Sequence, residues 1–523
     1  MLKLNLKAIP PLLLSIHLLI PAPLFASDRA LSPETLLQSS WLSMSHPRFK
    51  LMTDTNTEDA QALYRALSEF DFYIQRIMKP TISPNIKPVT IYAPTQRKNR
   101  ALLSLVKNSV GFTHKSLRGN YIVADLKGFD TRHRASKQNA LRTLKHEYIH
   151  YLTRNSQEFG DGLPLWLEEG LAEYWSTLRV GKMRVSYGHL KKENFQKMVS
   201  KRPIPISKLI TTRALPTNLA KGQELYAHAT LITHFLMSDT KRAAGLPQFV
   251  EAMRSGPSPE HAFRQWVQMS DGKLRHKLKR HVRDLHRHHQ TSERVPFTVL
   301  APLPEIAERT DLAMGFGALL THFPGENPAP FLDIAQEDIQ YFLTALTLSI
   351  NRKVERNEFP QAEVLLSDVS PYYQGNPLWM IAKANLLLAR ARSSEPAVDE
   401  SKRTQQVEAL GLLNQALSLN PENLEAHFLR GIYYTDSGAT EDIEQGITSW
   451  TRVNDIMHYS PSKYALAVLH LRKAEPDFDL AGDLLTNVLN TERRDLLVGS
   501  SQRILLKIRE HQIASKGFLV AAP

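Results

Sequence analysis

The sequence LKHEYIHYLTRNSQEFGDGLPLWLEEGLAEYW, at residues 144–175, decides the fold and chemistry expected of this chain. It opens with HEYIH at residues 146–150, an H-E-x-x-H motif. Residues four apart lie on one face of a helix, so His146 and His150 can bind one zinc ion together. Glu147 lies beside them and is expected to act as the general base on a water molecule.

The third zinc ligand is expected from the second half of this stretch, because catalytic zinc usually has three protein ligands and one open position. Glu169 follows His150 after a gap of 18 residues that contains a turn at 160–164. The turn allows a second helix to fold back and present the carboxylate. Glu168 is the alternative third ligand. Because adjacent helical residues point about 100° apart, only one of these two carboxylates can face the metal. Glu173, one turn beyond Glu169, favours Glu169 and is expected to hydrogen-bond a zinc-binding histidine.

This combination of motif, gap and the sequence EGLAEY at 169–174 resembles the gluzincin metallopeptidases, most of all the bacterial peptidase-MA-like domains. The resemblance covers residues 40–285 and is most specific over 144–175. It implies a thermolysin-like zincin domain, Zn2+ as the cofactor and a peptide or protein as the substrate. The aminopeptidase motif that anchors a substrate's free amino end has no clear counterpart in this sequence.

Gluzincins also commonly place a tyrosine or histidine from a downstream helix beside the zinc, as a donor to the carbonyl oxygen under attack. Tyr226, on a helix expected to begin near Glu224, matches this position. A phenol keeps its proton at neutral pH and is a good donor. A tyrosine in the core of an apolar helix is the alternative. His228 is a competing donor, but it points about 200° away from Tyr226 on the same helix.

In the resembling families an extended substrate pairs with the edge strand of a small sheet above the metal. Residues 120–126, NYIVADL, are expected to form a strand just upstream of the zinc helix. The resemblance therefore makes Gly119, Asn120 and Tyr121 candidate substrate-binding residues. A purely structural strand is the alternative. The same part of the chain is expected to contain strands at 49–52 and 88–92 and helices at 57–77 and 101–106.

Composition limits the possible chemistry. The 523 residues include no cysteine, so disulfides and thiolate metal sites are excluded and metal ligands must be His, Asp or Glu. The net charge of +13 fits either an anionic neighbour, such as a membrane surface or cell-wall polymer, or a basic soluble protein. The sequence contains no visible nucleic-acid-binding motif, so no nucleic acid partner is expected.

Residues 1–26 read as a signal peptide, with Lys3 and Lys7 before an apolar stretch and cleavage expected after Ala26. Four prolines within this stretch argue against a membrane-spanning helix, and an uncleaved anchor is the alternative. The mature chain is therefore expected to have no transmembrane segment and to be periplasmic or secreted by a bacterium. Export without cysteine fits a bacterial periplasm or exterior.

The expected fold is α+β for a metallopeptidase domain at 27–290, whose last helix carries the basic sequence 273–289. A proline-rich segment at 291–336 follows, either an irregular linker or a packed connector. Residues 337–523 are almost purely helical in pattern and are expected to form an all-α domain. Within them 407–438 resembles a tetratricopeptide repeat (TPR), with looser copies at 360–390 and 447–471 and a closing pair at 478–510.

Two functions of different classes follow from these features. The first is an exported zinc-dependent metallopeptidase with Glu147 as its base. The second is a non-catalytic periplasmic TPR adaptor whose peptidase-like part is a zinc-stabilised scaffold. Stacked repeat helices form a concave surface that usually binds a protein or peptide partner, although a structural appendage is also possible. The intact Glu147 favours the enzyme, because a scaffold does not need a base.

Overall fold

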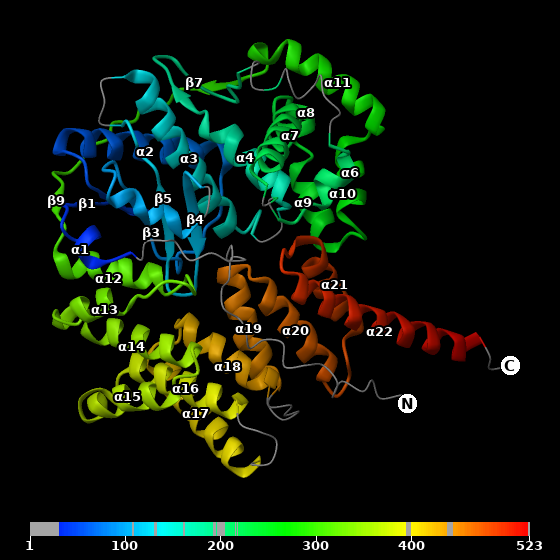
Figure 1. The fold of residues 1–523 in the computed structure, drawn as a ribbon. Helices are drawn as coiled ribbons and strands as arrows, with labels where there is room; N and C mark the ends of the chain where they lie inside the picture. Colours follow the sequence, from blue (N-terminus) through cyan, green and yellow to red (C-terminus); the bar gives the residue numbers. More distant parts are fainter. Residues whose placement is uncertain are drawn as a thin grey trace.

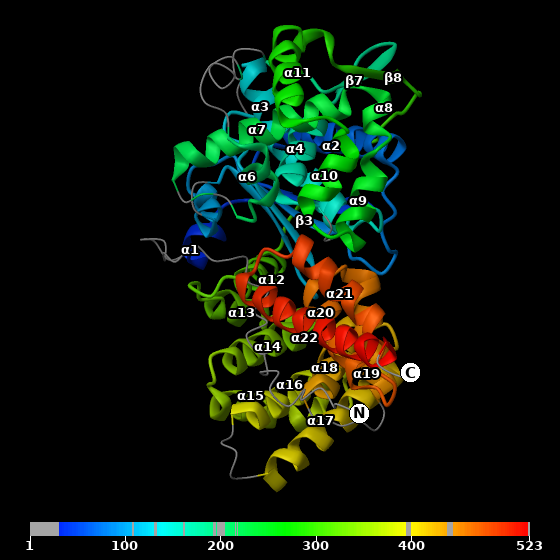
Figure 2. The ribbon, with the colours of Figure 1, turned by 90° about the vertical axis from the view of Figure 1, so that its right-hand side faces the viewer.

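The structure is a computed structural model that describes residues 31–106, 109–129, 133–160, 163–191, 195, 204–214, 216, 218–393, 399–436 and 443–520. The expected signal peptide and its cleavage site at Ala26 lie outside these residues. The described chain is mostly helical, with one small mixed sheet and a second, smaller sheet. Figure 1 shows the α/β part, in blue to green, above a yellow-to-red array of helices, and Figure 2 shows the two tiers from the side.

The larger sheet has six strands in the order β4-β5-β3-β2-β1-β9. Strands β2, β3 and β5 are parallel to one another, whereas β1, β4 and β9 run antiparallel to their neighbours. The strands are β1 (Leu42–Ser45), β2 (Phe49–Thr53), β3 (Val89–Ala93), β4 (Gly111–Lys115), β5 (Asn120–Ala124) and β9 (Glu305–Ile306).

The expectation that Gly119, Asn120 and Tyr121 lie on an edge strand is wrong. In β5, Tyr121 pairs with Thr90 of β3 on one side and with His114 of β4 on the other. A tight turn closes the β4–β5 hairpin, and within it the Ser116 hydroxyl donates to the Gly119 carbonyl at 2.8 Å. The hairpin therefore adds one more strand outside β5, and β4 becomes the edge next to the zinc-motif helix.

Two helices carry the decisive stretch. α3 (Arg134–Asn155) holds the HEYIH motif and packs against β4 and β5, whereas α4 (Leu165–Ser176) folds back along it. Tyr148 and Trp166 are fully buried in the core between these helices and the sheet. α2 (Thr57–Met78) begins at its cap Asn56, whose side chain accepts from the Asp59 amide, and lines the same core.

The helix that carries Tyr226, α7 (Leu219–Met237), begins five residues before the expected start at Glu224. The Asn218 side chain accepts from the Lys221 amide and caps the helix at this earlier point. α7 packs closely against α4. The rest of this part consists of α1 (Pro33–Leu36), the 3-10 helix η2 (Asn99–Leu105), β6 (Arg179–Val180), β7 (Arg184–Tyr187), α6 (Ile206–Thr211), α8 (Thr240–Ala243), α9 (Leu246–Ser255), α10 (Pro259–Val267), α11 (Asp271–Arg283), η3 (Leu285–Arg287) and β8 (Gln290–Glu293).

The proline-rich segment at 291–336 has no helix or strand over 294–304 and is packed beyond it. It supplies β9 to the sheet and two helices, α12 (Arg309–Leu320) and α13 (Ala329–Ala335). Phe316 of α12 packs against Trp41 and Tyr92 on the sheet face opposite α3. Each sheet face therefore has its own helical cover, α2 and α3 on one side and α12 and α13 on the other.

The chain beyond the connector forms helices that pack mainly on their neighbours in sequence. The helix pairs expected at 360–390, 407–438, 447–471 and 478–510 are present. No described helix is long and apolar enough to cross a membrane. The helices are α14 (Ile339–Glu355), α15 (Phe359–Tyr373), α16 (Pro377–Ser393), α17 (Asp399–Leu419), α18 (Leu424–Asp436), α19 (Ile443–Met457), α20 (Ser460–Arg472), α21 (Phe478–Thr491) and α22 (Asp495–Val520).

The helical array contacts the α/β part at its middle and near its C-terminal end (Figure 1). Arg118, in the β4–β5 turn, forms an ion pair with Glu425 of α18 at 2.6 Å. At the far end α21 packs against α9, and the Asn490 side chain donates to the Gly256 carbonyl at 2.8 Å. The array therefore lies directly below the edge strand and the two helices of the zinc motif.

Candidate metal centre

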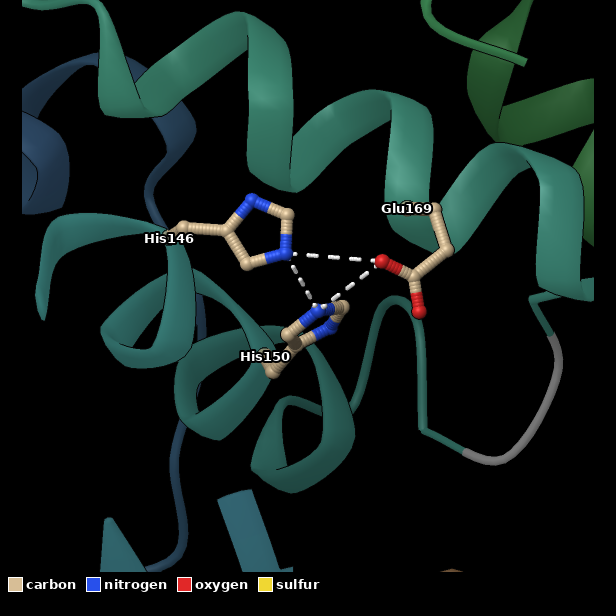
Figure 3. A group of neighbouring side chains, drawn as sticks. All are labelled: His146, His150 and Glu169. Atoms are coloured by element: carbon tan, nitrogen blue, oxygen red, sulfur yellow. Dashed lines mark hydrogen bonds and ion pairs between the residues drawn. The ribbon is translucent and has the colours of Figure 1, made fainter. Parts of the chain in front are cut away.

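Three side chains from α3 and α4 point at one spot (Figure 3). The Nε2 atoms of His146 and His150 lie 3.1 Å apart, and Glu169 Oε2 lies 3.4 Å from each of them. Among the described residues, this is the group of His, Asp and Glu side chains with spacing suited to a metal ion. The predicted ligands His146, His150 and Glu169 are therefore brought together by the fold.

The donor set fits a metal cation. Glu169 Oε2 is buried without a hydrogen-bond partner among the described residues, although it faces two imidazole nitrogens. Burial lowers the pKa of His146, but the nearby carboxylates of Glu169 and Glu173 outweigh it and hold the pKa well above the usual value. The pocket thus favours positive charge, and two imidazoles with one carboxylate suit zinc.

Two further carboxylates lie beside the outer nitrogens of the imidazole rings. Glu173 Oε1 lies 3.3 Å from His146 Nδ1, at ion-pair distance, but neither outer nitrogen makes a hydrogen bond among the described residues. Glu168 Oε1 lies 3.3 Å from His150 Nδ1, so Glu168 supports a ligand and does not compete with Glu169 for the metal. The alternative that Glu168 is the third ligand is therefore wrong, because the helix turns the two adjacent carboxylates to different sides. Such contacts fix the ring orientation and tautomer of a metal-binding histidine.

The carboxylate of Glu168 is held by two arginines that the sequence did not point to. Arg154 Nε donates to Glu168 Oε1 at 2.5 Å, and Arg493, between α21 and α22, pairs with the other oxygen. Burial raises the pKa of Glu168, but Arg154 and Arg493 outweigh it and hold the pKa well below the usual value. Arg154 lies one turn beyond His150 and could have been suspected, whereas no sequence signal connects residue 493 to residue 168.

Glu147, the expected base, is buried beside the metal group and faces β4. The Thr113 hydroxyl donates to Glu147 Oε2 at 2.9 Å and lies 2.7 Å from the Glu147 carbonyl. Gly111 provides the space next to it, because a Cβ atom there would lie 2.9 Å from Glu147 Cγ. The edge strand therefore positions the carboxylate of Glu147.

The outer edge of β4 is the strand edge nearest the metal group. The Asp125 amide donates to the Val110 carbonyl and the Ser116 amide to the Gly119 carbonyl, at 2.8 and 3.0 Å. Successive residues of an antiparallel strand direct their backbone N–H and C=O groups to opposite edges. Because residues 110 and 116 bond to the β5 side, the N–H and C=O groups of residues 111, 113 and 115 point outward from the sheet. Arg154 already donates to the outward Thr113 carbonyl at 2.7 Å.

Gly119, Asn120 and Tyr121 are not part of the metal group. Asn120 accepts from the Asn155 amide group at 3.4 Å, at the far end of α3, and Gly119 lies in the hairpin turn. Tyr121 faces the other side of the sheet, where its ring lies 5.8 Å from that of His322. The prediction of substrate contacts at these residues therefore loses the edge position on which it was based.

Tyr226 is beside the metal group. Burial raises the pKa of its phenol, and the neighbouring carboxylates of Glu169 and Glu147 raise it further. The phenol is therefore a donor at any physiological pH. His228, the competing donor, faces the other way, since its Nε2 accepts from the Ile204 amide at 3.3 Å and its Nδ1 lies 2.8 Å from the Glu224 carbonyl.

Comparison with known proteins adds little to this geometry. No protein-family model matches the chain, and no curated protein matches it. Among solved structures, the chain is similar to a thermophilic TPR protein of Thermus thermophilus, with 17% identity over 38% of this chain and 99% of that chain. The TM-score of 0.31 is too low for this similarity to assign a fold or a function.

Proposed function

We propose that this protein is a zinc-dependent metallopeptidase of the gluzincin type, exported by its N-terminal signal peptide. The observation that carries the proposal is the convergence of His146 Nε2, His150 Nε2 and Glu169 Oε2, with Glu147 on the adjacent position of the same helix. A buried cluster of this kind, with a base beside it, is the arrangement that metal-assisted hydrolysis needs.

Each side chain has a defined task in this proposal. His146, His150 and Glu169 would hold the zinc ion, which when bound supplies a Lewis acid that acidifies water and polarises a carbonyl. Glu147 accepts the proton of the attacking water and passes it to the leaving amine. Thr113 holds one oxygen of Glu147, so the other oxygen remains available for the proton.

Tyr226 would act on the substrate rather than on the water. Its protonated phenol lies beside Glu169 and can donate to the carbonyl oxygen as that oxygen gains negative charge. Glu173 and Glu168 keep the Nδ1 atoms of the two histidines engaged, which leaves both Nε2 atoms directed at the metal. These contacts would fix the geometry of the site before substrate binds.

The helical array, in this proposal, is a TPR-like domain that presents a protein or peptide to the catalytic part. Its support is the series of stacked helix pairs and their contacts with the β4–β5 turn and α4. Stacked pairs of this type form extended binding surfaces. A partner held on that surface would be close to the metal group.

The deciding experiment compares the wild-type protein with Glu147→Gln on a proteome-derived peptide library, with cleavage sites identified by mass spectrometry. Zinc content is measured on both proteins. We expect both to contain about one zinc ion per chain and only the wild type to cleave. Equal cleavage by both proteins would refute Glu147 as the base, whereas a protein with neither zinc nor cleavage would favour the TPR adaptor.

A further inference from the structure

A large cavity lies beside the first half of α3, away from the helical array. Its volume is about 660 Å3. The walls come from α2, α3, the end of α4, the β6 and β7 region and η3. A cavity of this size is large enough for several atoms of a ligand, because small-molecule sites range from about 300 to 1,000 Å3.

A smaller pocket of about 240 Å3 lies between the cavity and two residues that neighbour the candidate metal group. Tyr226 and Glu173 line the smaller pocket, and Glu173 is the residue 3.3 Å from His146 Nδ1. The two hollows share the wall residues Arg142, Leu190 and Lys191. A chain that passes Tyr226 at the metal can therefore place a neighbouring group in the larger cavity.

The walls of the larger cavity are cationic. Four Lys and Arg residues line it, against the single carboxylate of Glu69. Arg142 is neutralised by an ion pair with Glu173, and Lys145 donates to the Leu178 carbonyl at 3.1 Å while it interacts electrostatically with Glu69.

The other two cations, Arg179 and Lys191, have no ion-pair partner among the described residues. Both side chains are exposed to solvent in the cavity wall. Two unpaired positive charges on one concave wall create a local potential that attracts anions. A guanidinium and an ammonium together are well suited to a carboxylate, since Arg binds its two oxygens and Lys supplies a point charge.

We propose that this cavity is the specificity subsite of the enzyme and that it binds a carboxylate of the substrate through Arg179 and Lys191. The inference rests on the proposed peptidase function and adds a substrate class to it, namely acidic peptides. The carboxylate belongs either to an Asp or Glu side chain near the scissile bond or to the free C-terminus of the peptide. Both sources share the same recognition chemistry and are separated by the experiment.

The test measures peptide binding without turnover. Zinc-loaded Glu147→Gln protein is titrated with fluorescent peptides that carry Glu, Gln or Lys at one position, each with a free or an amidated C-terminus, and anisotropy reports the affinity. We expect the acidic peptide to bind at least about tenfold more tightly than its neutral counterpart, because two cations act on one carboxylate in a concave site. The preference should weaken with salt.

A charge-reversed variant, Arg179→Glu/Lys191→Glu in the same background, should lose this preference and favour the Lys peptide. The matched control is Arg275→Glu/Lys279→Glu, which changes the net charge equally at exposed positions of α11 outside the cavity wall. The control should keep the tenfold preference, and thermal unfolding should show that all variants fold.

An equal loss of preference in both double variants would overturn the proposal, because the attraction would then depend on the net charge of the whole protein and not on the cavity. Unchanged binding in the cavity variant would overturn it as well. Dependence on the Glu side chain or on the free C-terminus would assign the source of the carboxylate. Because binding is measured on protein that does not hydrolyse, these outcomes are independent of whether the wild type proves to be a peptidase.

Discussion

Arg493, between the last two helices of the array, forms an ion pair with Glu168, and the other oxygen of Glu168 lies 3.3 Å from His150 Nδ1. Only one side chain, that of Glu168, therefore separates the helical array from His150, a member of the candidate metal group. Glu168 is buried, so its charge depends on the two arginines that face it. The relationship makes the metal centre sensitive to the position of a segment more than 300 residues away.

We predict that Arg493→Gln weakens zinc binding by about tenfold, the lower end of the range for residues that orient a metal ligand. Arg493→Lys should weaken it less, because the positive charge remains. Competition with a chromophoric chelator measures the affinity. The control is Arg494→Gln, since Arg494 pairs with Glu492 and not with Glu168. Unchanged zinc affinity in Arg493→Gln would show that Arg154 alone is sufficient to hold Glu168.

Tyr226→Phe should reduce kcat by about 100-fold and leave KM and zinc content nearly unchanged. The substitution removes only the phenol oxygen, which is the donor to the carbonyl oxygen under attack. Steady-state kinetics on a cleaved library peptide checks this. Tyr64→Phe is the control, because its hydroxyl donates to the Ser45 carbonyl away from the metal group. A loss confined to KM would instead assign Tyr226 to substrate binding.

Gly111→Ala should impair the base without removing the metal. The new Cβ atom would lie 2.9 Å from Glu147 Cγ and 3.1 Å from Oε1, so the carboxylate must move. We expect kcat to fall at least tenfold, since a small misplacement of a catalytic group is costly. Zinc content should stay at the wild-type level. Gly272→Ala, at a position with open space around it, should behave as wild type.

Gly170→Ala should destabilise the pairing of α4 with α7. The added Cβ atom would lie 2.0 Å from Thr233 Oγ1 and 2.9 Å from the Ala229 carbonyl oxygen. Overpacking of this kind costs about 1–3 kcal/mol of unfolding free energy. Because Glu169 is the neighbouring residue, zinc affinity should fall with it. Adding Thr233→Ala removes the nearest atom and should restore part of the stability in urea denaturation.

Lowering the pH from neutral should destabilise the protein through His114. This side chain is buried on β4, and neither ring nitrogen has a partner among the described residues. Burial, together with the charge of Arg154, lowers the pKa of His114 to about 4, below its ordinary value of 6.5. The unfolded chain therefore binds a proton between pH 6.5 and 4 that the folded protein does not.

The free energy of unfolding should accordingly be unaffected by His114 above pH 6.5 and decrease as the pH falls below it. The contribution lost at pH 5 is roughly 2 kcal/mol. His114→Phe removes the titration, so it should reduce the loss of stability between pH 7.5 and 5 by about this amount relative to wild type in urea denaturation. An identical loss in both proteins would show that His114 is protonated in the folded state.

The sequence alone determined the local geometry of the metal ligands. The spacing of His146 and His150 on one helix is fixed by the helical repeat, and the Gly-rich turn before α4 made the return of Glu169 predictable. Glu173 followed from the same repeat. The helix pairs beyond residue 337 were also predictable, because each shows its own apolar face and its bends carry proline.

Only the tertiary structure decided which strand lies at the sheet edge and which distant residues reach the metal centre. Strand order depends on pairing between segments, and β4 has no sequence pattern that would have placed it outside β5. The contacts of Thr113 with Glu147 and of Arg493 with Glu168 join segments 34 and 325 residues apart. The residue pattern of a single segment predicts which side chains share one face of a helix. These contacts, in contrast, form only after separate elements pack together.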